Sequence, residues 1–311
     1  MDSFKRSPAL PVFLIALSCL FFLTATSYAD QNSLQQKYQQ LKKKLDTNSY
    51  GVPVYIESAI EAQSQSGDVY GIIYHPYKKV KTAFSQVENW CEIAPLHLNV
   101  KACTFLKLNG DYLLTLYSGR KYFERPEDTY QLVYRYHLDN KQENYTRTIL
   151  SAEDGPLGTS DYLISTEAMP LNDTETFIHF SYSYKQGFWT RMAMKTYLAT
   201  LGRDKVGFTV IDTDSNGDPV YIDGVRGVIE RNAIRYYYAI QAYLDTVSTA
   251  HEKLLLTRLN RWFDLTEQHH EQLYEMEKKE YLDYKQQERV EQNRLQQEID
   301  KTSLVSFSST H

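Results

Sequence analysis

An acidic segment between positions 212 and 223 has the residue types and the spacing of a calcium-binding loop. Oxygen-bearing side chains recur at alternate positions around a glycine that would supply the sharp turn: Asp212, Asp214, Asn216, Gly217, Asp218 and Asp223. Asp223 is too short for the usual bidentate glutamate, and Pro219 occupies a position that is normally apolar. The Asn216-Gly217 pair therefore favours a polar hairpin turn, and calcium binding is the alternative.

The other metal-like and catalytic patterns in the sequence are incomplete. His251 and Glu252 begin a zinc-protease-like motif, but Leu255 stands where the second histidine ligand belongs. His269 and His270 are adjacent, so their side chains would point to different sides of a helix. The sequence contains no nucleophile elbow, no phosphate-binding loop and no paired CxxC motif. We therefore predict no metal, no cofactor and no catalytic residue.

The side chains that could contact a ligand are concentrated in one long helix predicted over 225–247. Its apolar residues recur at spacings of three and four, and about 20 residues of helix extend roughly 30 Å. Asn232 lies between Ile229 and Tyr236 on the inward face, so we expect it to face the interior. A buried asparagine needs hydrogen-bond partners. A ligand head group or the protein itself could supply them.

The first 29 residues have the pattern of a secretory signal peptide. Lys5 and Arg6 precede an apolar run over 10–23, and small residues precede the expected cleavage after Ala29. The run is too short to span a membrane comfortably. We therefore expect a periplasmic or secreted protein.

Cleavage after Ala29 would leave two cysteines, Cys91 and Cys103. An even count in an oxidising compartment predicts a disulfide, which would close a short loop and stabilise the fold by about 3 kcal/mol. Two buried free thiols are the alternative interpretation. The net charge of −5 over 311 residues is mild, so no nucleic-acid partner is expected.

Composition and periodicity divide the rest of the chain into three parts. Residues 30–53 are predicted to form a helical lead and linker, 54–247 the main domain, and 248–311 a charged helical tail. In the main domain, alternating apolar residues predict strands over 54–75, with a turn at 63–68, then one helix over 77–90. Antiparallel strands follow from position 99, and a further helix is predicted over 188–201. The tail has an apolar stripe with Trp262, but from Glu288 on it is predicted to be disordered and to bury almost nothing.

This order of elements, together with three sequence stretches, resembles the helix-grip or START-like superfamily. The stretches are WCEIAPLHLNVKAC (90–103), EDGPLGTSDY (153–162), and MAMKTYLATLGRDKVGFTV with GVRGVIERNAIRYYYAIQAYL. They are similar to a group of exported proteobacterial proteins from which no catalytic residues can be transferred. The resemblance covers about 54–247 and implies an α+β fold, in which a curved antiparallel sheet wraps around a long C-terminal helix. It also implies a cavity between sheet and helix that suits an apolar or amphipathic ligand.

The leading hypothesis is a non-catalytic protein that binds or carries a hydrophobic small molecule or lipid. The residues that we expect in the cavity wall are Tyr236, Asn232, Tyr243, Trp189 and His97. One alternative is a cyclase- or hydrolase-type enzyme of the same fold, with His97 or His179 as acid–base. Another is a structural or interaction protein whose helical tail binds a protein partner. Peripheral contact with a membrane is a further alternative.

Overall fold

The computed structural model describes residues 30–48, 50–61, 63–187 and 205–308, with side chains up to Ser303. The predicted signal peptide and the helix expected over 188–201 lie outside the described residues and stay predictions. None of the described helices is both long enough and apolar enough to cross a membrane.

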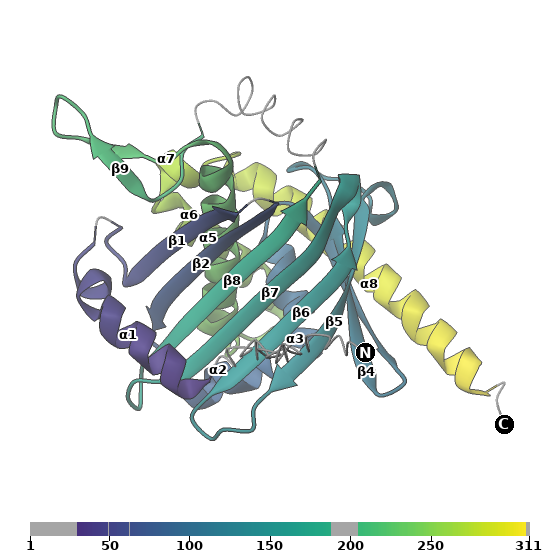
Figure 1. Cartoon of the computed structure of the whole chain (residues 1–311). Helices are drawn as coiled ribbons and strands as arrows, with labels where there is room; N and C mark the ends of the chain where they lie inside the picture. Colours follow the sequence, from purple (N-terminus) through teal and green to yellow (C-terminus); the bar gives the residue numbers. More distant parts are fainter. Residues whose placement is uncertain (1–29, 49, 62, 188–204, 309–311) are drawn as a thin grey trace, which may run out of the picture.

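In the described residues, eight antiparallel strands form one sheet in the order β1-β2-β8-β7-β6-β5-β4-β3 (Figure 1). Hairpin connections place the strands from β3 to β8 side by side, and β2 pairs with β8. Their bounds are β1 (Val54–Glu61), β2 (Ser64–Ile73), β3 (Val100–Leu108), β4 (Asp111–Ser118), β5 (Tyr130–Asp139), β6 (Thr146–Asp154), β7 (Thr159–Pro170) and β8 (Thr176–Gln186). A separate hairpin consists of β9 (Val210–Thr213) and β10 (Pro219–Tyr221).

The helices cover both faces of this sheet and one of its edges. Figure 1 shows α1 on one face and α5 and α6 on the other. The described helices are α1 (Gln31–Asp46), α2 (Tyr77–Phe84), α3 (Val87–Ile93), α5 (Gly224–Thr246), α6 (His251–Glu267), α7 (His270–Leu273) and α8 (Lys278–Ser308), with 3-10 turns η1 (Ala94–Leu96), η2 (Pro126–Asp128) and η3 (Pro156–Gly158). The predicted α+β class, with an antiparallel sheet around a long helix, is confirmed.

The long helix α5 is buried on two sides. Its inward residues, such as Ile229 and Ile240, pack on the concave face of the sheet, and α6 covers its other side. Two glycines of β2 allow a close approach: a Cβ on Gly71 would lie 2.1 Å from the Tyr237 hydroxyl, and one on Gly67 would lie 3.1 Å from the Ile229 carbonyl oxygen. The sheet therefore contacts the helix backbone closely at β2.

The helix α1 packs on the opposite, convex face of the sheet. Asp30 caps it, because its carboxylate accepts a hydrogen bond from the Ser33 N–H at 2.8 Å. The helix buries Leu34, Leu41 and Leu45 of one face in a second, smaller core.

Two local predictions are wrong. The polar segment 63–68 is not a turn, because β2 begins at Ser64 and pairs with β1 on one side and β8 on the other. Backbone pairing on both edges extends the strand through its first five residues, 64–68, although these are not apolar. The helix predicted over 77–90 is broken, since Gln86 has an extended backbone between α2 and α3.

The tail packs on the domain through α6 and the first part of α8. Trp262 of α6 is buried, and its Nε1 donates a hydrogen bond to the Arg235 carbonyl oxygen at 3.0 Å. The helix α8 then runs along β3, the last strand of the sheet. The expectation that the tail buries almost nothing from Glu288 on is wrong, because Glu288 and Gln292 are both buried. Their burial depends on hydrogen bonds rather than on apolar contacts, so the count of apolar residues did not indicate it.

Candidate functional site

The concave face of the sheet and α5 together form a group of contacting aromatic rings. Side chains alternate between the two faces of a strand, so every second residue of β8 points toward α5. The Tyr236 ring lies 5.7 Å from Phe180 and 6.0 Å from Tyr182, between ring centroids. We call this group the inner aromatic wall: Tyr134, Tyr162, Phe180, Tyr182, Tyr184 and Tyr236.

Several hydroxyl groups of this wall have no partner among the described residues. Within the described part of the chain, the hydroxyls of Tyr134, Tyr182 and Tyr236 form no hydrogen bond. Tyr182 and Tyr236 are also only half-buried, although they belong to the interior. Burial, and then the neighbouring phenols, raises the pKa of all three side chains. The wall therefore presents neutral O–H groups among apolar ring surfaces.

His97 extends the wall at the end of η1. Its ring stacks on Tyr236 with the centroids 4.5 Å apart. Nδ1 accepts a hydrogen bond from the Asn99 N–H at 3.1 Å, so the neutral imidazole carries its proton on Nε2. Burial, followed by the nearby Arg235 and Lys285, holds the pKa of His97 well below its usual range. Nε2 is buried and has no hydrogen-bond partner in the described part of the chain, so it is an unused donor there.

Two polar residues of α5 lie beside His97. Asn232 is half-buried, and its side chain interacts with the His97 ring without completing a hydrogen bond to Nε2. Arg235 is 2% exposed, and its Nη2 donates to the Leu273 carbonyl oxygen at 3.1 Å and to Glu275 at 2.9 Å. Nε of Arg235 is buried and has no partner among the residues that the structure describes. Two unused N–H donors are therefore present at this end of the wall.

Glu275 is the counter-ion of Arg235, but it is shared with two lysines. Its carboxylate also pairs with Lys121 and Lys205. Burial would raise the pKa of Glu275, but the Arg235 guanidinium and the two lysines outweigh it and lower the pKa to about 2. One ionised carboxylate therefore faces three cations.

The structure brings together three of the five predicted wall residues: His97, Asn232 and Tyr236. Tyr243 has different neighbours, because the Arg258 guanidinium lies 4.6 Å from its ring. Trp189 lies outside the described residues. The sequence analysis missed Arg235, although its position three residues after Asn232 places both on neighbouring parts of one helix surface.

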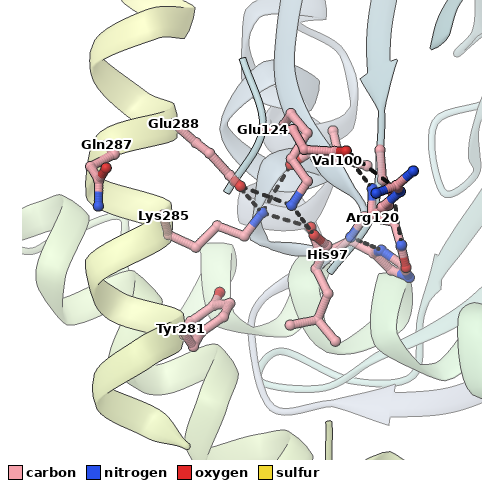
Figure 2. Close-up of polar contacts among 12 residues, drawn as sticks. His97, Val100, Arg120, Glu124, Tyr281, Lys285, Gln287 and Glu288 are labelled. Carbon is pink, nitrogen blue, oxygen red and sulfur yellow. Dashed lines mark hydrogen bonds and ion pairs between the residues drawn. The ribbon is translucent and has the colours of Figure 1, made fainter. Parts of the chain in front are cut away.

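A buried ion cluster attaches α8 to the turn that carries His97 (Figure 2). The Nζ of Lys285 donates to the carbonyl oxygens of His97 and Val100, both at 2.9 Å, and to Glu288 at 2.7 Å. Lys101 of β3 binds the other Glu288 oxygen at 2.8 Å. We call Lys101, Lys285 and Glu288 the tail ion cluster. Burial, partly offset by Glu288, lowers the pKa of Lys285 to about 8.

Two glutamines continue the attachment along β3. Gln292 accepts a hydrogen bond from the Cys103 N–H at 2.9 Å and donates to the Cys91 carbonyl oxygen at 3.0 Å. Gln296 bonds the N–H and the carbonyl oxygen of Phe105 in the same way, at 2.9 and 3.0 Å. Their amides therefore satisfy edge-strand backbone groups that a neighbouring strand would otherwise pair.

Cys91 and Cys103 form a disulfide in the structure, with their Cα atoms 4.8 Å apart. The predicted bridge between α3 and β3 is therefore present. It lies directly beneath Gln292, which binds the backbone of both half-cystines.

The second predicted acid–base candidate, His179, lies on the convex face of the sheet. Its ring stacks on Tyr70 at 4.2 Å and forms hydrogen bonds to Glu167 at 2.7 Å and Asp68 at 2.9 Å. Burial alone would lower the pKa of His179, but these two carboxylates outweigh it and raise the pKa to about 9. His97 and His179 are on opposite faces and cannot act on one bound molecule.

The acidic segment forms the exposed turn of the β9–β10 hairpin. The Asp214 carboxylate accepts hydrogen bonds from the backbone N–H groups of Asn216 at 2.8 Å and Asp218 at 2.9 Å. Gly217 has a φ of 89°, as this turn requires. The remaining members, Asp212 and Asp223, lie in β9 and just before α5. Among the described residues, no group of three or more His, Cys, Asp or Glu side chains could hold a metal ion.

The sheet wrapped around α5 defines the fold as helix-grip, or START-like. No family model matches the chain, and no curated protein matches its sequence. Solved structures that are similar include TTHA0849 from Thermus thermophilus (10% identity, TM-score 0.40, 59% of this chain and 99% of that one). Human StAR-related lipid transfer protein 5 is similar at 10% identity (TM-score 0.35, 70% and 98%), and the Zhui aromatase/cyclase from Streptomyces sp. R1128 at 12% (TM-score 0.31, 67% and 94%). These similarities concern the fold alone.

Proposed function

We propose that this protein binds a hydrophobic or amphipathic small molecule, such as a lipid, between its sheet and α5, without catalysing a reaction. The observation that carries the proposal is a set of hydroxyls, on Tyr134, Tyr182 and Tyr236, that form no hydrogen bond within the described residues and lie among apolar ring surfaces. Binding sites are commonly apolar surfaces with a few polar groups. A ligand with an apolar body and some polar atoms would match such a surface.

Further features support a binding protein over the alternatives. The enzyme alternative uses His97 or His179 as acid–base, and of these two only His97 contacts the inner aromatic wall, whereas His179 stacks on Tyr70 on the opposite face of the sheet. The apolar stripe of the tail already packs inside the molecule, where Trp262 is buried, so this stripe is not available to a partner helix. The Cys91–Cys103 disulfide suits an oxidising compartment, and we include export in the proposal.

The proposal is tested with native protein purified without detergent. Mass spectrometry of the extracted small molecules should identify a co-purifying amphiphile. Native mass spectrometry should then measure micromolar or tighter binding of a panel that contains hexadecanoate, methyl hexadecanoate and hexadecanol.

A matched pair of variants separates binding from folding. Tyr236→Ala removes part of the inner aromatic wall and should weaken binding at least tenfold, with a smaller loss of stability. Tyr237→Ala removes the next residue of α5, which packs against Gly71 of β2. It should lower stability more and affinity less. If nothing co-purifies and no member of the panel binds, the proposed function is wrong.

A further inference from the structure

The end of the inner aromatic wall at His97 has an excess of hydrogen-bond donors. His97 and Arg235 are each 2% exposed, and each has one buried nitrogen, Nε2 and Nε respectively, that has no partner within residues 30–187 and 205–308 as far as they are described. Both atoms are donors, because Nδ1 of His97 is the acceptor for Asn99 and a guanidinium has no acceptor. Leaving a buried donor unpaired is unfavourable, because the donor has lost its hydrogen bonds to water without gaining another. The missing partner must therefore supply acceptor oxygens.

Positive charges outnumber negative charges around these two donors. Five cations, Arg235, Lys121, Lys205, Lys101 and Lys285, form ion pairs with two carboxylates, Glu275 and Glu288. A third carboxylate, Glu124, acts electrostatically on Lys101, so the cations are still in excess. Arg235, Lys285 and Lys101 all act electrostatically on His97. An anion near His97 would be attracted in this poorly solvated region.

We propose that this end of the wall binds the carboxylate head group of an amphiphilic ligand, with its oxygens accepting from Nε2 of His97 and Nε of Arg235. The proposal rests on the proposed function and specifies its ligand class. The half-buried Asn232 adds an amide at the same place. Ring contacts lead away from His97 through Tyr236 and Tyr182 to Tyr184, and the apolar chain would follow them.

Two probes of equal chain length test the head group. Hexadecanoate and methyl hexadecanoate share the apolar chain, but only the first is an anion at pH 8. Native mass spectrometry or calorimetry of the full mature protein should give a Kd at least tenfold lower for hexadecanoate. His97→Phe keeps a ring on Tyr236 but removes the Nε2 donor, so it should reduce this preference to less than threefold. His97→Gln returns an N–H donor and should recover part of it.

Arginine variants complete the test. Arg235→Gln should also reduce the preference, whereas Arg258→Gln should leave it unchanged. Arg258 is equally buried, at 2% exposed, but pairs with Glu92 instead. If Arg235→Gln does not fold, the preference for hexadecanoate measured in the two His97 variants tests the head-group assignment.

The outcomes separate the two proposals. Equal binding of the acid and the ester by the wild-type protein, or a preference for acid that survives in His97→Phe and Arg235→Gln, would overturn the head-group assignment alone. Failure to bind either probe, with no co-purifying molecule, would overturn the proposed function as well.

Discussion

His97 and Lys285 connect the tail to the inner aromatic wall. The carbonyl oxygen of His97 accepts a hydrogen bond from Nζ of Lys285 at 2.9 Å, and the imidazole of the same residue stacks on Tyr236. The position of the ring therefore depends on a contact made by α8. A tail that looks peripheral in the sequence is a structural support of the candidate site.

Glu288→Gln should destabilise the protein by about 3–5 kcal/mol, because Lys101 and Lys285 would stay buried without a carboxylate. Urea unfolding monitored by circular dichroism measures this change. Glu291→Gln is the control, since Glu291 lies on the same helix but is partly exposed and pairs with Arg294. A loss below about 1 kcal/mol in Glu288→Gln would mean that the tail ion cluster does not hold α8.

The double variant Gln292→Ala with Gln296→Ala should expose the backbone of β3. Each change leaves a strand N–H without its acceptor, so hydrogen exchange at the amides of Cys103 and Phe105 should accelerate at least tenfold. Mass-spectrometric hydrogen exchange detects this. The exposed Gln287, which donates to the Asp283 carbonyl oxygen, provides the control substitution to Ala. Unchanged protection of β3 would contradict the assigned contacts.

His179 should make stability fall as the pH rises from about 6.5 to 9. Its pKa is raised to about 9 in the folded protein, so the folded state binds more protons than the unfolded state between these values. The contribution, on the order of 3 kcal/mol, is present below pH 6.5 and lost by pH 9. Lys285 acts in the opposite direction above pH 8, because its folded pKa is lowered to about 8.

Urea midpoints at pH 6.5 and 8 isolate the histidine effect. His179→Gln should be less stable than the wild-type protein at pH 6.5 and should have a flatter pH profile. Parallel profiles for the two proteins would show that His179 does not carry a charge between Asp68 and Glu167.

The fold could be predicted from the sequence largely through its apolar periodicity. The central helix, the β3–β4 hairpin at Asn109 and Gly110, and the docked Trp262 each have a pattern that burial of apolar side chains produces. The disulfide followed from the cysteine count and the expected compartment. At the candidate site, His97, Asn232 and Tyr236 could be proposed together because they lie near or on the aromatic helix.

The docking of the tail end could not be found in the same way. Lys285, Glu288, Gln292 and Gln296 are polar, so their burial leaves no apolar period. Their spacing of three and four residues along one face of α8 was the available signal. Reading it would have required the knowledge that β3 is an edge strand, which only the sheet order gives. Arg235 was missed because its Nε is buried without a partner among the described residues only as a result of tertiary packing, which the sequence does not show.

Along the contact between α8 and β3, the helix and the strand advance by slightly different distances for each pair of contacting residues. Four residues of helix advance about 6.0 Å and two residues of strand about 6.6 Å, so helix and strand go out of step by roughly 0.6 Å at each successive pair. Glu288 with Lys101, Gln292 with Cys103 and Gln296 with Phe105 form three such pairs. Beyond them the offset approaches 2 Å, more than a hydrogen bond tolerates. There the two elements diverge, and a groove of about 390 Å³ opens between Leu106 and Leu108 of β3 and Ile299 of α8.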